Sequence, residues 1–65
     1  MSAMRASITD EATVKAAGYT VAAYGDHGYT LIDPEGDYRM IAGYGHVAPT
    51  RWEAVAEGLR RIAQG

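Results

Sequence analysis

Few side chains in this sequence could carry out covalent or metal chemistry. Asp26 precedes His27 in a glycine-flanked segment, and the second histidine, His46, follows another pair of glycines. These three side chains could ligate a metal ion, but coordination needs three or four convergent ligands, and neighbours in a tight turn seldom point at one ion. Ser2 and Ser7 lack the glycine-flanked pattern of a nucleophilic serine, and cysteine is absent. We therefore expect no catalytic residue, no metal site and no cofactor.

The acidic residues indicate binding instead of catalysis. Between residues 16 and 38 the chain contains four acids and no Lys or Arg, and three of these acids fall within five residues. Carboxylates beside tyrosines suit a basic protein partner, because Tyr makes contacts at a low entropic cost. The alternative is a solvated turn, in which Asp accepts hydrogen bonds from nearby backbone groups. On the first interpretation, the partner-binding residues are Asp26, Asp33, Glu35, Asp37, Tyr38 and Tyr44.

A three-stranded antiparallel sheet over residues 19–42 is predicted to carry most of these residues. Runs at 19–24, 29–33 and 38–42 are rich in Tyr, Thr and β-branched residues, and Gly, Asp and Pro lie between them. With a two-residue loop at each turn, Tyr24 lies opposite Tyr29, and Leu31 lies opposite Met40. Neither face of this sheet is purely polar. We therefore expect one face to pack on a helix and the other to be covered by the N-terminal segment or by a second copy of the chain.

The C-terminal helix is predicted over residues 50–63. Thr50 and Glu53 have the spacing of a capping box. Apolar residues recur at helical spacing from position 52 to position 63, and Glu57 and Arg61 fall on the opposite, polar face as a favourable i,i+4 pair. Gly58 interrupts the helix and should cost about 1 kcal/mol relative to Ala.

A shorter helix is predicted over residues 9–17, where Thr9 precedes two acids and Gly18 provides a stop. Residues 1–7 are expected to be loose. The whole chain, residues 1–65, is then a single α+β domain. It consists of a short N-terminal helix, a three-stranded antiparallel β-meander and an amphipathic C-terminal helix packed on the sheet.

Length and composition set further limits. A 65-residue chain buries only about 60% of its unfolded surface. It contains twelve Ala but ten Leu, Ile and Val in total and no Phe, so the core is thin and a dimer would hide more surface. The first 18 residues hold no long apolar run. We therefore expect neither a signal peptide nor a membrane anchor, and we expect the protein to be cytoplasmic.

The predicted order of three strands and one helix over residues 19–63 resembles the plant AP2-type DNA-binding domain. Sheets of that family carry many Arg and Lys, whereas these strands contain Arg39 alone and the sequence pI is about 5.5. Because the positive charge that phosphate binding requires is missing, we expect no direct contact with nucleic acid.

A second resemblance rests on the small size, the lack of cysteine, the Pro34–Asp37 turn with its acids Asp33, Glu35 and Asp37, and the helix that starts at Thr50. In these features the chain is similar to inhibitors encoded by phages and mobile elements, anti-CRISPR proteins among them. The resemblance implies a non-catalytic inhibitor in the host cytoplasm, whose acidic, Tyr-rich patch blocks a basic nucleic-acid channel on a CRISPR effector subunit. Two alternatives stay open: a small accessory homodimer module of a phage or bacterium, and a minimal metal enzyme around Asp26, His27 and His46.

Overall fold

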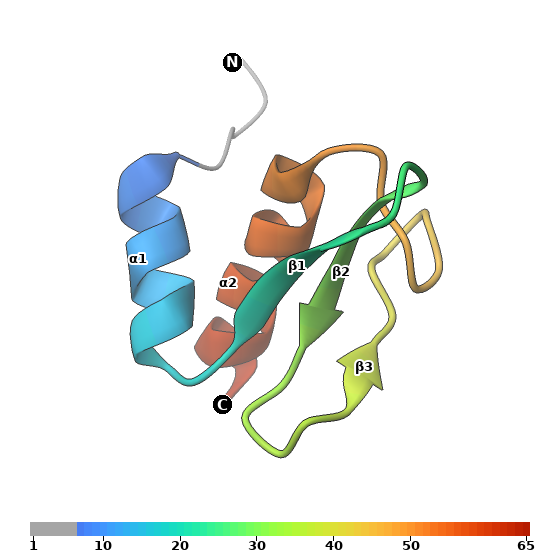
Figure 1. The fold of residues 1–65 in the computed structure, drawn as a ribbon. Coiled ribbons are helices and arrows are strands. Elements are labelled where there is room, and N and C mark those ends of the chain that lie inside the picture. The colour runs from blue at the N-terminus through green and yellow to red at the C-terminus, as the bar shows by residue number, and fades with distance from the viewer. Residues whose placement is uncertain (1–6) are drawn as a thin grey trace.

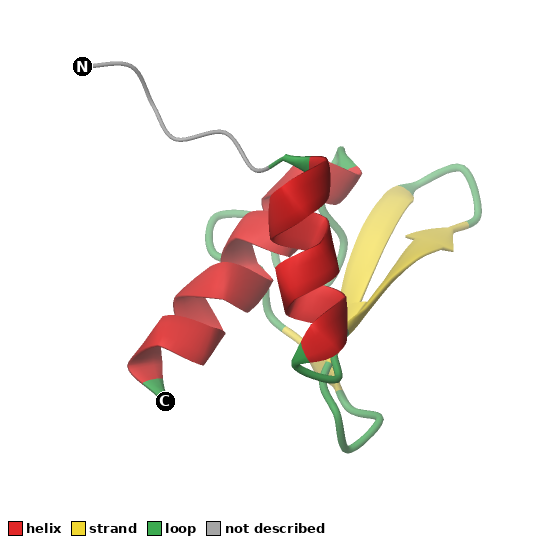
Figure 2. Cartoon of the chain, turned by 90° about the vertical axis from the view of Figure 1, so that its left-hand side faces the viewer, coloured by secondary structure: helices red, strands yellow, loops and turns green. Residues whose placement is uncertain are grey.

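The computed structural model describes residues 7–65, in which two helices pack on one side of a small antiparallel sheet (Figure 1). The elements follow in the order α1 (Ile8–Ala16), β1 (Thr20–Tyr24), β2 (Gly28–Ile32), β3 (Tyr38–Arg39) and α2 (Arg51–Gln64). The strands lie in the order β1-β2-β3. Helix α2 packs across β1 and β2, and α1 lies beside α2 (Figure 2). The predicted α+β fold is therefore confirmed.

Helix α1 begins earlier than the sequence suggested. Ser7 is its N-cap and forms a capping box with Asp10, whose backbone N–H donates to Ser7 Oγ at 3.3 Å while the Ser7 N–H donates to Asp10 Oδ2 at 2.9 Å. Two donors at the helix start are thereby satisfied. Ser7, expected to be loose, is instead fixed by the cap. The rest of the segment expected to be loose, residues 1–6, lies outside the described residues.

The strand register differs by one residue from the predicted one. Tyr24 pairs with Gly28 and Ala23 pairs with Tyr29, because the first turn has three residues instead of two. In the second hairpin Leu31 pairs with Arg39, and a five-residue connection joins β2 to β3. Side chains alternate between the two faces along each strand. A shift of one residue in pairing therefore changes which side chains of neighbouring strands share a face. Leu31 thus shares its face with Val21 and Arg39 and not with Tyr24.

The third strand is shorter than the predicted run to residue 42. After Arg39 the chain leaves the sheet, and an isolated bridge between Ile41 and Gly45 closes a tight loop. The chain then returns to β2, where Tyr29 and Ala48 exchange two backbone hydrogen bonds of 2.8 and 2.9 Å. The sheet edge beside β2 is therefore made in two pieces, and the segment between them, residues 40–47, projects as a loop.

The core lies between the sheet and the two helices. Its buried hydrophobic residues are Val14, Leu31, Ile41, Ala48, Ala54 and Val55. Gly58 of α2 lies directly beneath α1: a Cβ placed there would meet the Val14 methyl carbons at 2.9 and 3.0 Å. Gly58 is therefore not simply a weak point in the helix, because it allows α1 and α2 to approach each other closely.

Helix α2 confirms the predicted helix, but its cap and its buried face differ from the prediction. Thr50 is the N-cap residue, but its side chain accepts no hydrogen bond from the helix backbone. Its hydroxyl donates to the Glu53 carboxylate instead. The predicted capping box is thus absent. Glu57, predicted to be solvent-facing, is buried beside Gly58. Neither helix of residues 7–65 is long and apolar enough to cross a membrane.

Candidate functional site: the open face of the sheet

Both helices cover the same face of the sheet, so the opposite face, here called the open face, has no helix over it (Figures 1 and 2). The register places Tyr24, Thr30 and Tyr38 on this side, since Leu31 points into the helix-covered core. Tyr24 is 51% exposed and Tyr38 is 56% exposed. Two large aromatic side chains thus lie on the uncovered side of a sheet whose other side holds the core.

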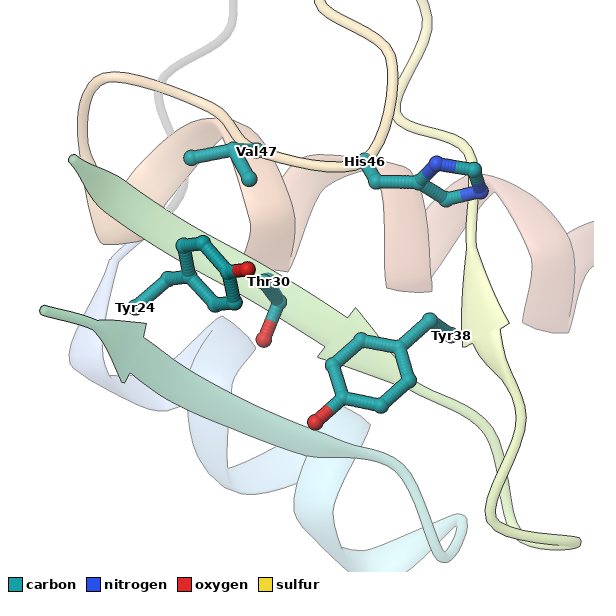
Figure 3. Close-up of a pocket in the computed structure, with 5 residues that line it drawn as sticks. All are labelled: Tyr24, Thr30, Tyr38, His46 and Val47. Carbon is teal, nitrogen blue, oxygen red and sulfur yellow. The ribbon is translucent and has the colours of Figure 1, made fainter.

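The open face contains a hollow of about 410 Å³. Figure 3 shows Thr30 between the rings of Tyr24 and Tyr38, with Val47 and His46 on the neighbouring loop. The loop positions its two residues because backbone hydrogen bonds hold it at both ends, from the Ile41 N–H to the Gly45 carbonyl and between Tyr29 and Ala48. The hollow therefore combines residues from all three strands and from the loop that follows β3; its lining residues are Tyr24, Thr30, Tyr38, His46 and Val47.

Side-chain contacts fix part of the hollow. Thr30 is only 2% exposed, and its hydroxyl donates to the Ala22 carbonyl oxygen at 3.3 Å. The Tyr24 ring lies against His27, with 5.9 Å between the ring centroids and 43° between the ring planes. The base of the hollow is therefore packed, whereas the tyrosine rings at its sides remain half exposed.

The structure separates the predicted acidic patch into two parts. Asp26 lies in the β1–β2 turn, whereas Asp33, Glu35 and Asp37 lie in the β2–β3 turn, at the other end of the antiparallel strands. With five residues in β2, the two turns are roughly 17 Å apart. Tyr38 adjoins the second turn.

Tyr44, the remaining predicted binding residue, is exposed in the loop after β3, but it does not line the hollow. Of the predicted binding residues, only Tyr38 contributes to the lining.

Asp33 has a structural role in its turn. Its Oδ1 atom accepts hydrogen bonds from the backbone N–H groups of Glu35 at 3.0 Å and Asp37 at 2.9 Å. Its other oxygen lies 3.6 Å from Arg39. This is the turn chemistry that explains Asp at such positions without a partner protein. Glu35 and Asp37, in contrast, are exposed and form no ion pair within residues 7–65.

Three carboxylates of this turn, from Asp33, Glu35 and Asp37, could each offer a ligand atom to a cation, and these atoms lie within 4.8 Å of one another. Because Asp33 already serves the turn, the cluster is accounted for by the hairpin itself. The other set considered from the sequence, Asp26, His27 and His46, is not brought together as a group of possible metal ligands in the described part of the chain.

Most basic residues lie away from the open face. Arg51 pairs with Glu11 at 2.8 Å, and Arg60 and Arg61 pair with Glu57 on α2. Arg39 shares the helix-covered side with its strand partner Leu31. Lys15 belongs to α1. Among residues 7–65, no Lys or Arg lines the hollow, whereas Arg39 and Arg61 lie beside Asp33 and Glu35 at the β2–β3 turn, away from the hollow.

Glu57 is a buried carboxyl group with donors around both of its oxygens. One of its oxygens accepts from the Ala42 N–H at 3.1 Å and from Arg60 at 2.5 Å, and the other lies 2.9 Å from Arg61 Nε. Burial acts to raise the pKa of Glu57, but the hydrogen bonds from Arg60 and Ala42 and the charges of both arginines outweigh it and lower the pKa. A carboxylate that is held ionised and surrounded by donors can link the loop after β3, through the Ala42 N–H, to α2.

Comparison with protein-family models, with curated proteins and with solved structures finds no match. The candidate site therefore rests on its geometry. The sequence predicts Tyr38 as a binding residue and offers His46 only as a metal ligand, and it does not single out Tyr24, Thr30 or Val47 as site residues. A three-residue first turn would have revealed the pairing of Ala22 with Thr30. The return of the chain to β2 at Ala48 has no local sequence signal.

Proposed function

We propose that this protein is a non-catalytic binding module whose open face docks on a basic surface of a protein partner. One observation carries the proposal: half-exposed tyrosines lie on an uncovered sheet face, with carboxylates free of ion pairs in the turns at both of its ends. Interfaces commonly place aromatic residues at the centre and polar residues at the rim. Buried Tyr side chains often contribute much of the binding free energy.

The distribution of charge supports a basic partner. Asp26, Glu35 and Asp37 have no ion-pair partner within residues 7–65, whereas four of the five described basic side chains are paired with acids of this chain. Carboxylates at an interface rim mainly speed association and select against acidic surfaces. A phosphate backbone would meet repulsion at the same face.

The inhibitor function suggested by the resemblance to anti-CRISPR proteins belongs to this proposal. Basic protein surfaces of the required kind occur where proteins hold nucleic acid. A module bound there would exclude DNA or RNA by occupying the surface, without copying the shape of a duplex. We therefore propose a CRISPR effector subunit as the first partner to test.

The test compares tagged variants as baits in bacterial lysate supplemented with representative CRISPR effector complexes. Wild type is compared with Tyr24→Ala/Tyr38→Ala and with Asp26→Asn/Glu35→Gln/Asp37→Asn, and the controls are Ile8→Ala and Glu53→Gln on the helices. We expect a stoichiometric partner with wild type and both controls, loss with the tyrosine variant, and slower, less salt-sensitive association with the neutralised variant. Equal capture by all five proteins would refute this interface.

A homodimer module is the second candidate, supported by four large apolar side chains of the strands and the loop after β3 that are at least 48% exposed: Tyr24, Tyr38, Met40 and Tyr44. Light scattering distinguishes the two. A dimer that dissociates in Tyr24→Ala/Tyr38→Ala, with no partner captured, favours self-association. A monomer at high concentration excludes it.

A further inference from the structure

The hollow on the open face offers aromatic rings and hydrogen-bond acceptors. Its polar lining consists of three hydroxyl groups and the His46 imidazole. The hydroxyl proton of Thr30 is directed to the Ala22 carbonyl, so the Thr30 oxygen is left to act as an acceptor. The rings of Tyr24 and Tyr38 lie on either side of Thr30 (Figure 3). Their faces carry the negative end of the ring quadrupole, which attracts cations.

The charges around the hollow also favour a bound cation. Asp37 directly precedes Tyr38, and Asp26 follows Tyr24 by two residues. Neither acid has an ion-pair partner among the described residues, and no Lys or Arg lines the hollow. Each acid is within two residues of a tyrosine that lines the hollow, and charges act over roughly 8–10 Å in physiological salt. An anion would meet repulsion from these carboxylates and no Lys or Arg in the lining, so the charges favour a cation in the hollow.

We infer that this hollow accepts the guanidinium group of an arginine on the partner, an inference that rests on the proposed function and supplies the chemistry of its central contact. Guanidinium is planar, carries five N–H donors and no acceptor, and stacks on aromatic rings. The hollow therefore presents the acceptors and ring faces that this group needs. A volume of about 410 Å³ holds one such side chain together with water.

An ammonium group fits less well. Lysine ends in a compact, strongly hydrated point charge, which loses more hydration for each contact that it gains with a ring. The cation–π attraction at an exposed site is modest and strengthens binding only a few-fold for each ring. We therefore expect an order of preference in which arginine binds best, lysine binds more weakly and a neutral isostere binds least.

Nuclear magnetic resonance titration of the ¹⁵N-labelled full chain at pH 7.5 tests this order. The probes are three capped pentapeptides, Gly-Gly-X-Gly-Gly, in which X is arginine, lysine or citrulline, the neutral isostere of arginine. For the arginine peptide we expect saturable shifts at the amides of Tyr24, Thr30 and Tyr38, with a dissociation constant on the order of 1 mM. The citrulline peptide should bind at least fivefold more weakly.

Variants connect the shifts to the rings. Tyr24→Leu and Tyr38→Leu each keep an apolar side chain but remove the ring, and each should weaken arginine binding roughly threefold. Tyr44→Leu is the matched control, because Tyr44 is also half exposed but does not line the hollow. It should leave the affinity unchanged.

The inference is overturned if citrulline or lysine binds as tightly as arginine, if the shifts are confined to residues 33–37, or if no shift occurs up to 20-fold the expected dissociation constant. These results are independent of the partner capture described above. A captured partner that needs Tyr24 and Tyr38, combined with no preference for arginine, would retain the open face as the interface and reject the guanidinium contact alone.

Discussion

At the residue scale, glycines and one aspartate hold backbone positions that other residues would disturb. A Cβ on Gly28 would overlap the carbonyl oxygen of Ala48, which accepts the hydrogen bond from the Tyr29 N–H. Gly28 also has φ +144°, where side chains are rare. This glycine therefore permits the chain to return to β2, and the return in turn places His46 and Val47 beside the hollow.

Gly28→Ala should accordingly destabilise the protein much more than Gly36→Ala. Both glycines have positive φ, but nothing lies within 4 Å of a Cβ at Gly36. We expect Gly36→Ala to cost about 1–2 kcal/mol from backbone strain alone. Gly28→Ala should cost roughly 3 kcal/mol or more, because strain and overlap add. Urea unfolding of the two variants measures the difference, and equal losses would contradict the role given to the Ala48 carbonyl.

Asp33 differs in role from the other acids of its turn. Because its carboxylate accepts two backbone N–H groups, Asp33→Ala should lower the free energy of unfolding by about 1–2 kcal/mol. Glu35→Gln and Asp37→Asn remove no acceptor of these hydrogen bonds, so they serve as controls in the same thermal melts. If Asp33→Ala melts at the wild-type temperature, the turn does not depend on these bonds. A binding test that changes Asp33 would confuse folding with recognition.

At the element scale, the contact between α1 and α2 depends on a missing side chain. Alanine at position 58 gains about 1 kcal/mol of helix propensity over glycine. It must also displace the buried, β-branched Val14, and overpacking of a core costs about 1–3 kcal/mol. The packing penalty should exceed the gain in propensity, so the glycine that appears unfavourable from the sequence is favourable in the fold.

Gly58→Ala should therefore lower the melting temperature, and Val14→Ala should reverse the sign of its effect. In a double-mutant cycle, Gly58→Ala in the Val14→Ala background should be neutral or stabilising, because the space left by Val14 accepts the new methyl group. Additive losses in the cycle would show that the two side chains do not compete for space.

The tie between α2 and the loop should respond to pH. Because the folded pKa of Glu57 lies below its unfolded value, its stabilising contribution is present above the unfolded pKa and is lost as pH falls through the folded pKa. Glu57→Gln should lower the free energy of unfolding by roughly 1–2 kcal/mol at pH 7. The difference from wild type should shrink as pH falls below about 4. Urea unfolding from pH 3 to pH 7 measures this, and a constant difference would refute the assignment.

At the scale of the whole molecule, charge is divided between two sides. Ion pairs use most of the basic residues on the helices, which leaves unpaired acids in the turns at the ends of the open face. Since the side chains of these acids form no hydrogen bond or ion pair within residues 7–65, Asp26→Asn/Glu35→Gln/Asp37→Asn should keep the wild-type melting temperature within about 1–2 °C. Calorimetry tests this, and a large fall in melting temperature would mean that the acids stabilise the fold.

Sequence patterns determined the kind of elements and their order, because helical periodicity and turn residues act over a few neighbouring positions. They identified the α2 helix, two hairpins and the Glu57–Arg61 pair, which the structure shows with 2.9 Å between its charged atoms. The tertiary structure decided the second piece of the sheet edge at Ala48, the burial of Glu57 and the packing role of Gly58. Each of these depends on groups distant in sequence: Ala48 returning to Tyr29, the Ala42 N–H reaching Glu57, and Val14 filling the space above Gly58. The hollow between Tyr24 and Tyr38 likewise lies open because both helices pack on the other face of the sheet, and no local sequence pattern specifies that packing.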